Sequence, residues 1–242
     1  MSALYMVSQS LDLRTFRRWC ASRGLAADEG RALHHLLSET FGKRALQPFR
    51  LLVAPEAKTA TLYAYSRSNE KVLRQTARET GTPDVLEICD PAQLAVKAMP
   101  DSWAEGRRLA FDIRVRPVRR LLRPAGAFAK GAEVDAFLAE ALHRSPKGPP
   151  DDVEARLRRD ELYTQWLGER LKGAAHLERA RMVRFERNRI ARDRGLSEGP
   201  DATFHGELSI TNSDGFAQRL IRGVGRHVAY GYGMLLLRPA GG

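Results

Sequence analysis

Cysteine is scarce in this sequence: only Cys20 and Cys89 occur among 242 residues. Neither has the spacing of a zinc site or a redox centre, and the two do not indicate a disulfide framework. The sequence also lacks a signal peptide and an apolar run long enough to cross a bilayer. We therefore expect a cytoplasmic protein without a membrane partner, and not a secreted or membrane-spanning one.

Acidic residues are also fewer than basic ones: the chain has 29 Asp and Glu and 40 Lys and Arg, which gives a net charge of +11. Residues 107–130 carry +7 and residues 179–194 carry +5, so the rest of the chain sums to −1. Charge concentrated in this way is typical of a protein with a polyanionic partner. Most of these cations are arginines, whose planar guanidinium fits phosphates and guanine edges.

Hydrophobic residues make up 43% of the chain, which is enough to build real cores. The patterns in the first part predict β-α-β-β-α-β, the order of a ferredoxin-like unit. Asp28 is a predicted N-cap and Gly42 a predicted C-cap of the second helix. The predicted strands are 3–7, 49–53, 59–65 and 85–88, and the predicted helices are 12–23, 29–42 and 69–80.

A second unit of the same kind follows residues 90–106, which contain two prolines and a glycine and read as irregular. We predict an α+β fold of two tandem ferredoxin-like (RRM-like) βαββαβ domains, at 1–95 and 107–242, with a linker at 96–106. Alternating apolar residues indicate a half-buried strand over 109–118. The other elements expected are a turn at 145–150, helices at 151–172 and 214–222, strands at 182–185, 204–210 and 234–237, and a basic loop at 187–200.

Four blocks of sequence, in the right order, resemble the CasE family of CRISPR-associated proteins. The resemblance covers most of the chain and is weakest from 55 to 105. The glycines of the last block follow the spacing G-x-G-x5-G-x-G. The blocks are Leu33-His34, Phe111 to Arg120, Trp166 to Leu171, and Phe204 to Ile210 followed by Gly223 to Gly233.

The resemblance implies a metal-independent endoribonuclease that binds the hairpin of CRISPR repeat RNA and cuts precursor CRISPR RNA once, at the 3′ base of the hairpin. The products would be a 2′,3′-cyclic phosphate and a 5′-hydroxyl, with the mature guide RNA retained in a Cascade-type effector complex beside other subunits. Such cleavage uses the 2′-hydroxyl of the RNA as its nucleophile. No acidic cluster suggests a bound metal, so we expect neither a metal nor a cofactor.

His34 is the predicted catalytic residue, because the family places its histidine on this helix and because a histidine near neutral pKa transfers protons well. It lies at the edge of the apolar stripe; His35 is expected to point away. Without the resemblance, a capping or edge histidine with no chemical role is the favoured interpretation, and the family match reverses it. Where the family often has a tyrosine, three residues earlier, this chain has Arg31, which shares a helical face with His34 and could neutralise charge on the phosphate.

The glycine-rich segment is the second candidate, since glycines let backbone amides approach a phosphate. Family members often place a lysine here; this chain has Val228 at that position, with His227 nearby as a rival catalytic histidine. His143, His176 and His205 are interpreted as structural. The predicted RNA-binding residues are Arg114, Arg116, Arg119, Arg120, Lys130, Arg184, Arg187, Arg189, Arg192, Arg194, Gly223, Gly225, Arg226, His227, Gly231 and Gly233.

Two alternatives stay open. One is a catalytically inactive subunit that only binds structured RNA, because the family's tyrosine and lysine are both replaced. The other is a structural or regulatory nucleic-acid binder, which would need the basic stretches but not His34. The sequence shows no helix-turn-helix and no zinc-finger spacing in its support.

Overall fold

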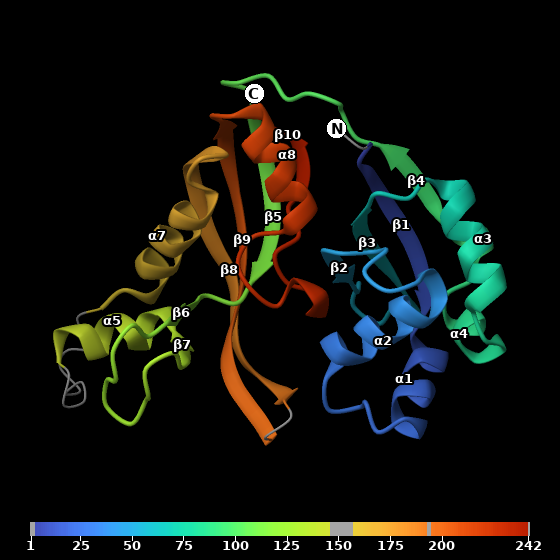
Figure 1. The fold of residues 1–242 in the computed structure, drawn as a ribbon, viewed down its shortest axis with the longest axis horizontal. Helices are drawn as coiled ribbons and strands as arrows, with labels where there is room; N and C mark the ends of the chain where they lie inside the picture. Colours follow the sequence, from blue (N-terminus) through green and yellow to red (C-terminus); the bar gives the residue numbers. More distant parts are fainter. Residues whose placement is uncertain (1–2, 146–156, 193–194, 242) are drawn as a thin grey trace.

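A computed structural model describes residues 3–145, 157–192 and 195–241 (Figure 1). Two four-stranded antiparallel sheets form the protein, with strand orders β2-β3-β1-β4 and β10-β5-β9-β8. When the four strands of each sheet are numbered in chain order, both sheets have the strand order 4-1-3-2, which is that of a ferredoxin-like unit. This result confirms the predicted α+β fold of two tandem ferredoxin-like units.

The first sheet packs against four helices, which lie on its right-hand and lower side in Figure 1. Its core includes Val7, Leu11 and Leu62 from the strands and Leu33, Leu36 and Leu73 from the helices. The elements are β1 (Tyr5–Asp12), α1 (Leu13–Ser22), α2 (Glu29–Phe41), β2 (Phe49–Leu52), β3 (Thr59–Ser66), α3 (Glu70–Thr80), α4 (Pro83–Ile88), the short 3₁₀ helix η1 (Pro91–Gln93) and β4 (Ala95–Ala98).

The second sheet packs against α7 and α8 through a core that includes Phe111, Trp166 and Phe216. A two-stranded sheet, β6 with β7, lies beside it. The elements are β5 (Arg108–Val115), β6 (Val118–Arg120), β7 (Glu133–Asp135), α5 (Ala136–Arg144), α7 (Arg159–Leu171), β8 (Ala175–Arg192), β9 (Gly195–Ile210), α8 (Ser213–Arg222), the 3₁₀ helix η2 (Val228–Tyr230) and β10 (Leu236–Pro239).

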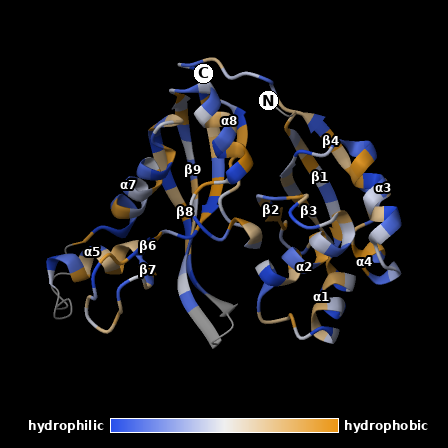
Figure 2. Cartoon of the chain, in the orientation of Figure 1, coloured by the Kyte–Doolittle hydropathy of each residue, from blue (hydrophilic) through white to orange (hydrophobic). Residues whose placement is uncertain are grey.

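The predicted ends of α2 are confirmed. The side chain of Asp28 accepts a hydrogen bond from the amide of Arg31, and Gly42 ends the helix with φ of 89°. The apolar stripe Leu33, Leu36 and Leu37 is buried, as expected. Figure 2 shows hydrophilic and hydrophobic segments alternating along the helices, which is the pattern of helices with one buried face.

The predicted strand at 85–88 is wrong, because these residues form α4. Pro83 fits the first turn of a helix, and Val85 and Ile88, three residues apart, are both buried. The strand that completes the first sheet is β4, which pairs with β1 inside the stretch expected to be irregular. The division into 1–95, 96–106 and 107–242 stays a prediction, and β4 extends across its first boundary.

The basic loop expected at 187–200 is also wrong. β8 and β9 pair continuously out to Arg192 opposite Gly195, so this stretch is the far end of one long hairpin, which projects below the sheet in Figure 1. Beyond Val115 the chain leaves the sheet and forms β6, and the last strand begins at Leu236. α5 and β7 were not predicted from the sequence. The expected turn at 146–150 and the first part of the helix expected from 151 lie outside the described residues.

No helix in the described part of the chain is long and apolar enough to cross a membrane.

Gly206 of β9 shows how tightly the second sheet is packed. A Cβ at this position would lie 2.3 Å from the carbonyl oxygen of Arg179 and 2.7 Å from the ring of Phe111. We expect Gly206→Ala to lower the free energy of unfolding by about 1–3 kcal/mol, the usual cost of overpacking. Chemical denaturation measures this change.

Gly168→Ala is the matched control. Gly168 lies inside α7, where an added Cβ would meet only Leu177 at an ordinary 3.8 Å. Alanine favours a helix over glycine by about 1 kcal/mol, so this variant should be as stable as the parent or more so. Equal destabilisation by both substitutions would contradict the packing argument.

Candidate functional site

His34 lies half-buried on α2 and faces η2 of the glycine-rich segment. Its ring centroid is 5.5 Å from that of Tyr230 and 5.9 Å from that of His35. These residues line a hollow of about 540 Å³, here called the histidine hollow. The structure therefore brings the two sequence-predicted candidates, the helix with His34 and the glycine-rich segment, into one place. The lining residues are His34, His35, Ser38, Lys43, Arg44, Gln47, Ala229 and Tyr230.

The close approach of α2 and η2 depends on Gly30. A Cβ there would lie 2.6 Å from the carbonyl oxygen of Tyr230, which is too close for any side chain. Gly231, directly after η2, has φ of 84°, a conformation that favours glycine. These two glycines let Tyr230 lie beside His34.

The surroundings of His34 favour its neutral form. Burial lowers the pKa of His34 from its ordinary value, and the positive charges of His35 and Arg44 lower it further. A neutral imidazole near pH 7 can accept a proton, which is what a general base must do.

Arg31, the second predicted catalytic residue, lies exposed on α2 and is not among the residues that line the histidine hollow. Two other cations, Lys43 and Arg44, do line it. They were missed in the sequence, although they directly follow Gly42, the predicted end of the helix that carries His34. His35, which was expected to point away from the apolar stripe, also lines the hollow and is not among the buried residues of α2.

His227 is held by a carboxylate instead of facing His34. Its Nε2 lies 2.7 Å from Oε1 of Glu133, and Arg226 Nε lies 2.5 Å from the other oxygen of the same carboxylate. Both residues thus fasten the glycine-rich segment to β7. His227 does not line the histidine hollow.

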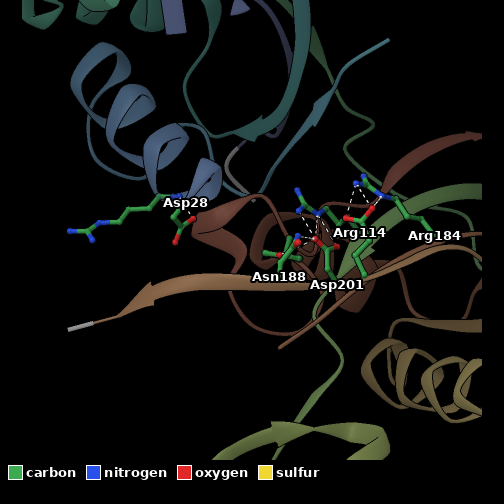
Figure 3. Close-up of polar contacts among 8 residues, drawn as sticks. Asp28, Arg114, Arg184, Asn188 and Asp201 are labelled. Carbon is green, nitrogen blue, oxygen red and sulfur yellow. Dashed lines mark hydrogen bonds and ion pairs between the residues drawn. The ribbon is translucent and has the colours of Figure 1, made fainter. Parts of the chain in front are cut away.

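A buried polar network lies under the glycine-rich segment, and Figure 3 shows Arg114 and Asn188 directed at Asp201. Arg114 Nε donates to Asp201 at 3.0 Å, Asn188 also donates to this carboxylate, and the Tyr232 hydroxyl does so at 3.2 Å. The guanidinium of Arg114 also stacks over the Tyr232 ring, 4.7 Å from its centroid. The network joins β5, β8 and β9 to the glycine-rich segment.

A second hollow of about 380 Å³, here called the hairpin hollow, lies above this network. It shares Tyr230 with the histidine hollow and reaches Arg187 and Asn188 on β8. Tyr230 therefore lies between a hollow that reaches the long hairpin and the hollow that contains His34. The lining residues are Ala27, Asp28, Gly30, Arg114, Arg187, Asn188, Tyr230 and Tyr232.

Several predicted RNA-binding arginines are already engaged within the protein. Arg116 is only 2% exposed, and Arg114 belongs to the buried network. Arg119 pairs with Glu169 and Arg184 with Glu186, so acidic side chains compensate part of the positive charge in the two basic stretches.

The other predicted RNA-binding side chains divide into two sets. Arg120 and Lys130 are exposed, and Arg187 is exposed with a loose contact of 3.9 Å to Glu198. The side chains of Arg189, Arg192 and Arg194 are not among those that the structure describes.

All four glycines of the G-x-G-x5-G-x-G segment have positive φ, which explains why glycine stands there. The amides of Gly223 and Gly233 donate to the carbonyls of Arg219 and Arg114. Those two amides therefore serve the fold of the segment, and a phosphate would have to use other donors.

The described residues contain no group of three or more His, Cys, Asp or Glu side chains that could hold a metal ion. His205, interpreted as structural, pairs through Nε2 with Asp112 at 2.8 Å.

Comparison with known proteins gives matches over the whole chain. A family model described as "CRISPR associated protein" matches residues 4–239. No sequence among the curated proteins matches the chain.

Solved structures share the fold. A CRISPR endoribonuclease Cse3 bound to 19-nucleotide RNA is 20% identical with a TM-score of 0.67, over 98% of this chain and 100% of that one. Cse3 of Thermus thermophilus, bound to an RNA representing a pre-cleavage complex, is 18% identical with a TM-score of 0.66, over 98% and 100%. The CRISPR-associated protein Cas6e of Escherichia coli is 16% identical with a TM-score of 0.59, over 97% and 100%.

The charges around His34 predict a measurable response to substitution. Removing the positive charge of Arg44 should raise the pKa of His34, because one repulsive cation is gone while burial and His35 still lower it. The protonated form would then persist to higher pH in Arg44→Ala than in the parent protein. NMR titration of the His34 ring protons, assigned with His34→Gln, measures the shift.

Arg78→Ala, on the exposed surface of α3 and outside the histidine hollow, controls for the loss of one positive charge elsewhere. It should leave the midpoint of the His34 titration nearly unchanged. A titration that is the same in Arg44→Ala and in the parent would show that Arg44 does not act on His34.

Proposed function

Because the chain belongs to the family of CRISPR associated proteins, we propose that it is an endoribonuclease that binds the hairpin of CRISPR repeat RNA and cuts precursor CRISPR RNA. The resemblance to the CasE family predicted from the sequence is confirmed by this match and by the shared fold with Cse3 and Cas6e. The observation that carries the proposal is the histidine hollow, where His34 with a lowered pKa lies beside Lys43 and Arg44.

The reaction follows from the chemistry of RNA itself. Neutral His34 accepts the proton of the 2′-hydroxyl, and this oxygen attacks the adjacent phosphorus. The bond from phosphorus to the 5′-oxygen breaks, and this oxygen leaves as a hydroxyl after taking up a proton. The products are a 2′,3′-cyclic phosphate and a 5′-hydroxyl. No step requires a metal ion, because the nucleophile belongs to the RNA.

The negative charge that develops on the phosphate needs positive charge nearby. Lys43 and Arg44 line the hollow with His34 and are suited to this role. Arg31 stays a second candidate for it, since it shares a helix face with His34 although it lies outside the hollow. The lining residues of the histidine hollow include no carboxylate that would oppose an anionic substrate.

The long β8–β9 hairpin is the proposed grip for the RNA stem. A-form RNA is recognised mainly through its shape and phosphates, which suits a projecting hairpin with exposed arginines. The hairpin hollow connects this element to His34. We further propose that the partners are the repeat hairpin, in precursor and mature guide RNA, and other subunits of a Cascade-type effector complex in the cytoplasm. Solved structures of a CRISPR RNA-guided surveillance complex include a chain of the same fold, with a TM-score of 0.56.

Substitution of His34 distinguishes an endoribonuclease from a subunit that only binds RNA. His34→Ala should slow single-turnover cleavage of a repeat hairpin by about 10²–10⁴-fold, the usual contribution of proton transfer by a side chain. RNA affinity should change little. His176→Ala, an exposed histidine on β8, should behave as the parent does. Activity should persist in excess EDTA.

A substrate with a 2′-deoxy nucleotide on the 5′ side of the cut tests the mechanism in the same assay. It should bind normally and stay intact, because it lacks the internal nucleophile. Cleavage of this substrate would rule out the mechanism. A parent protein that binds the hairpin tightly but never cuts it would support the inactive RNA-binding subunit.

The role of the hairpin in binding has its own test. Replacing Arg187 with alanine should weaken RNA binding and flatten its salt dependence, since each phosphate contact contributes about 0.7–0.9 to the slope of log K against log salt. Fluorescence anisotropy over a range of salt concentrations measures both. Arg78→Ala, exposed on α3, removes the same charge as a control. Equal salt slopes in the parent and the hairpin variant would place the RNA elsewhere.

A further inference from the structure

A third hollow, here called the arginine groove, lies next to the histidine hollow. Its volume is about 600 Å³, and it lies between the end of β3 and the end of α8. It shares Arg44 and Gln47 with the histidine hollow, so the two hollows are adjacent at these residues. Its lining residues are Leu4, Arg44, Ala45, Gln47, Tyr65, Ser66, Arg67, Ser68, Ile221 and Arg222.

The arginine groove carries positive charge that no side chain in the described part of the chain neutralises. Arg44, Arg67 and Arg222 are exposed, and the lining residues include no carboxylate. None of the three forms an ion pair with a described side chain. On the basic stretches, by contrast, Arg119 and Arg184 both have glutamate partners. Unneutralised cations gathered in a hollow favour an anionic ligand.

The neighbourhood of Arg222 adds to this excess. Arg219, one turn earlier on α8, has its pKa lowered by burial and then by the charges of Arg170 and Arg222. Its Nε is buried and has no hydrogen-bond partner among the described residues. Three arginines from α7 and α8 thus repel one another, none of them forms an ion pair with a carboxylate of the described residues, and a bound phosphate chain would relieve that repulsion.

The uncharged groups of the arginine groove suit a sugar–phosphate backbone. Ser68 and Gln47 offer polar groups at the rim, and Ser66 lies at its base, where its hydroxyl accepts a hydrogen bond from the amide of Ser68. The buried hydroxyl of Tyr65 is already used, since it donates to the carbonyl of Leu235 at 2.8 Å. That hydrogen bond joins the end of β3 to the second unit, beside the arginine groove.

The three hollows are neighbours, because each shares lining residues with the next. The hairpin hollow reaches Arg187, the histidine hollow follows through Tyr230, and the arginine groove continues through Arg44. If the stem lies on the long hairpin and the cut falls at its 3′ base, the strand that continues beyond the cut must leave on the opposite side. Resting on the proposed function, we propose that the arginine groove binds the phosphates of single-stranded RNA on the 3′ side of the cut, through Arg67 and Arg222.

The test uses the whole protein and three uncleavable RNAs, each with a 2′-deoxy nucleotide on the 5′ side of the cut. The first ends one nucleotide past the cut, the second has a longer 3′ extension, and the third has the same extension at the 5′ end. The parent protein should bind the second several-fold more tightly than the first, with a steeper salt slope by about 0.7 for each added phosphate contact. The 5′ extension should give no such gain.

Arg67→Ala with Arg222→Ala should abolish the gain from the 3′ extension and leave the affinity for the first RNA unchanged. The lysine pair, R67K with R222K, should keep most of the gain, because it keeps the charge. Arg17→Ala with Arg78→Ala, which removes two exposed arginines outside all three hollows, should keep all of it. An unchanged cleavage rate of the short ribose substrate shows that the alanine pair still folds.

Three results would overturn the proposal: equal binding of the first two RNAs by the parent, a gain from the 5′ extension instead of the 3′ one, or an equal loss of affinity for all three RNAs in the alanine pair. The cleavage assay keeps this failure distinct from failure of the proposed function. If the parent protein binds the 3′ extension as expected but cuts no ribose substrate, the proposed groove is supported and the proposed enzyme activity is contradicted. If the parent protein cuts the substrate but gains no affinity from the extension, only the proposed groove is contradicted.

Discussion

The buried carboxylate of Asp201 is the contact on which the rest of the site depends. Burial alone would lower the pKa of Arg114, but the hydrogen bonds and charge of Asp201 outweigh it and raise that pKa above its ordinary value. Removing one partner of such a buried pair leaves an uncompensated charge and costs about 3–5 kcal/mol. Because Tyr232 also donates to Asp201, the network fixes the glycine-rich segment two residues after Tyr230, and Tyr230 in turn packs against His34.

The histidine hollow is therefore a product of docking between the two units. His34 lies on α2 in the first unit, and Tyr230 lies on η2, close to the last strand of the second unit. Two further contacts join the units: Tyr65 donates to the carbonyl of Leu235, and Arg50 lies 3.5 Å from Asp112. A change that loosens these contacts would disturb the hollow without touching any residue that lines it.

Local signals explain which elements the sequence could predict. Asp28 and Gly42 act on their own helix, so the ends of α2 could be predicted without tertiary structure. Residues 85–88 are too few to distinguish a strand from a helix, and the hairpin at 187–200 is made by pairing between distant residues. His34 was found through its helix edge and the family resemblance. Arg44 and Tyr230 were missed because they reach the hollow only when the chain folds.

The same limit applies to charge. The sequence counts arginines but does not show which of them meet a carboxylate, so buried Arg114 and Arg116 were grouped with exposed cations. The folded protein separates two uses of one residue type. Ion pairs shielded from water, such as Arg114 with Asp201, are screened weakly by salt, whereas exposed cations such as Arg67 and Arg222 are screened strongly. Salt at a concentration that releases RNA should thus leave the architecture of the site intact, because binding and folding rely on different arginines.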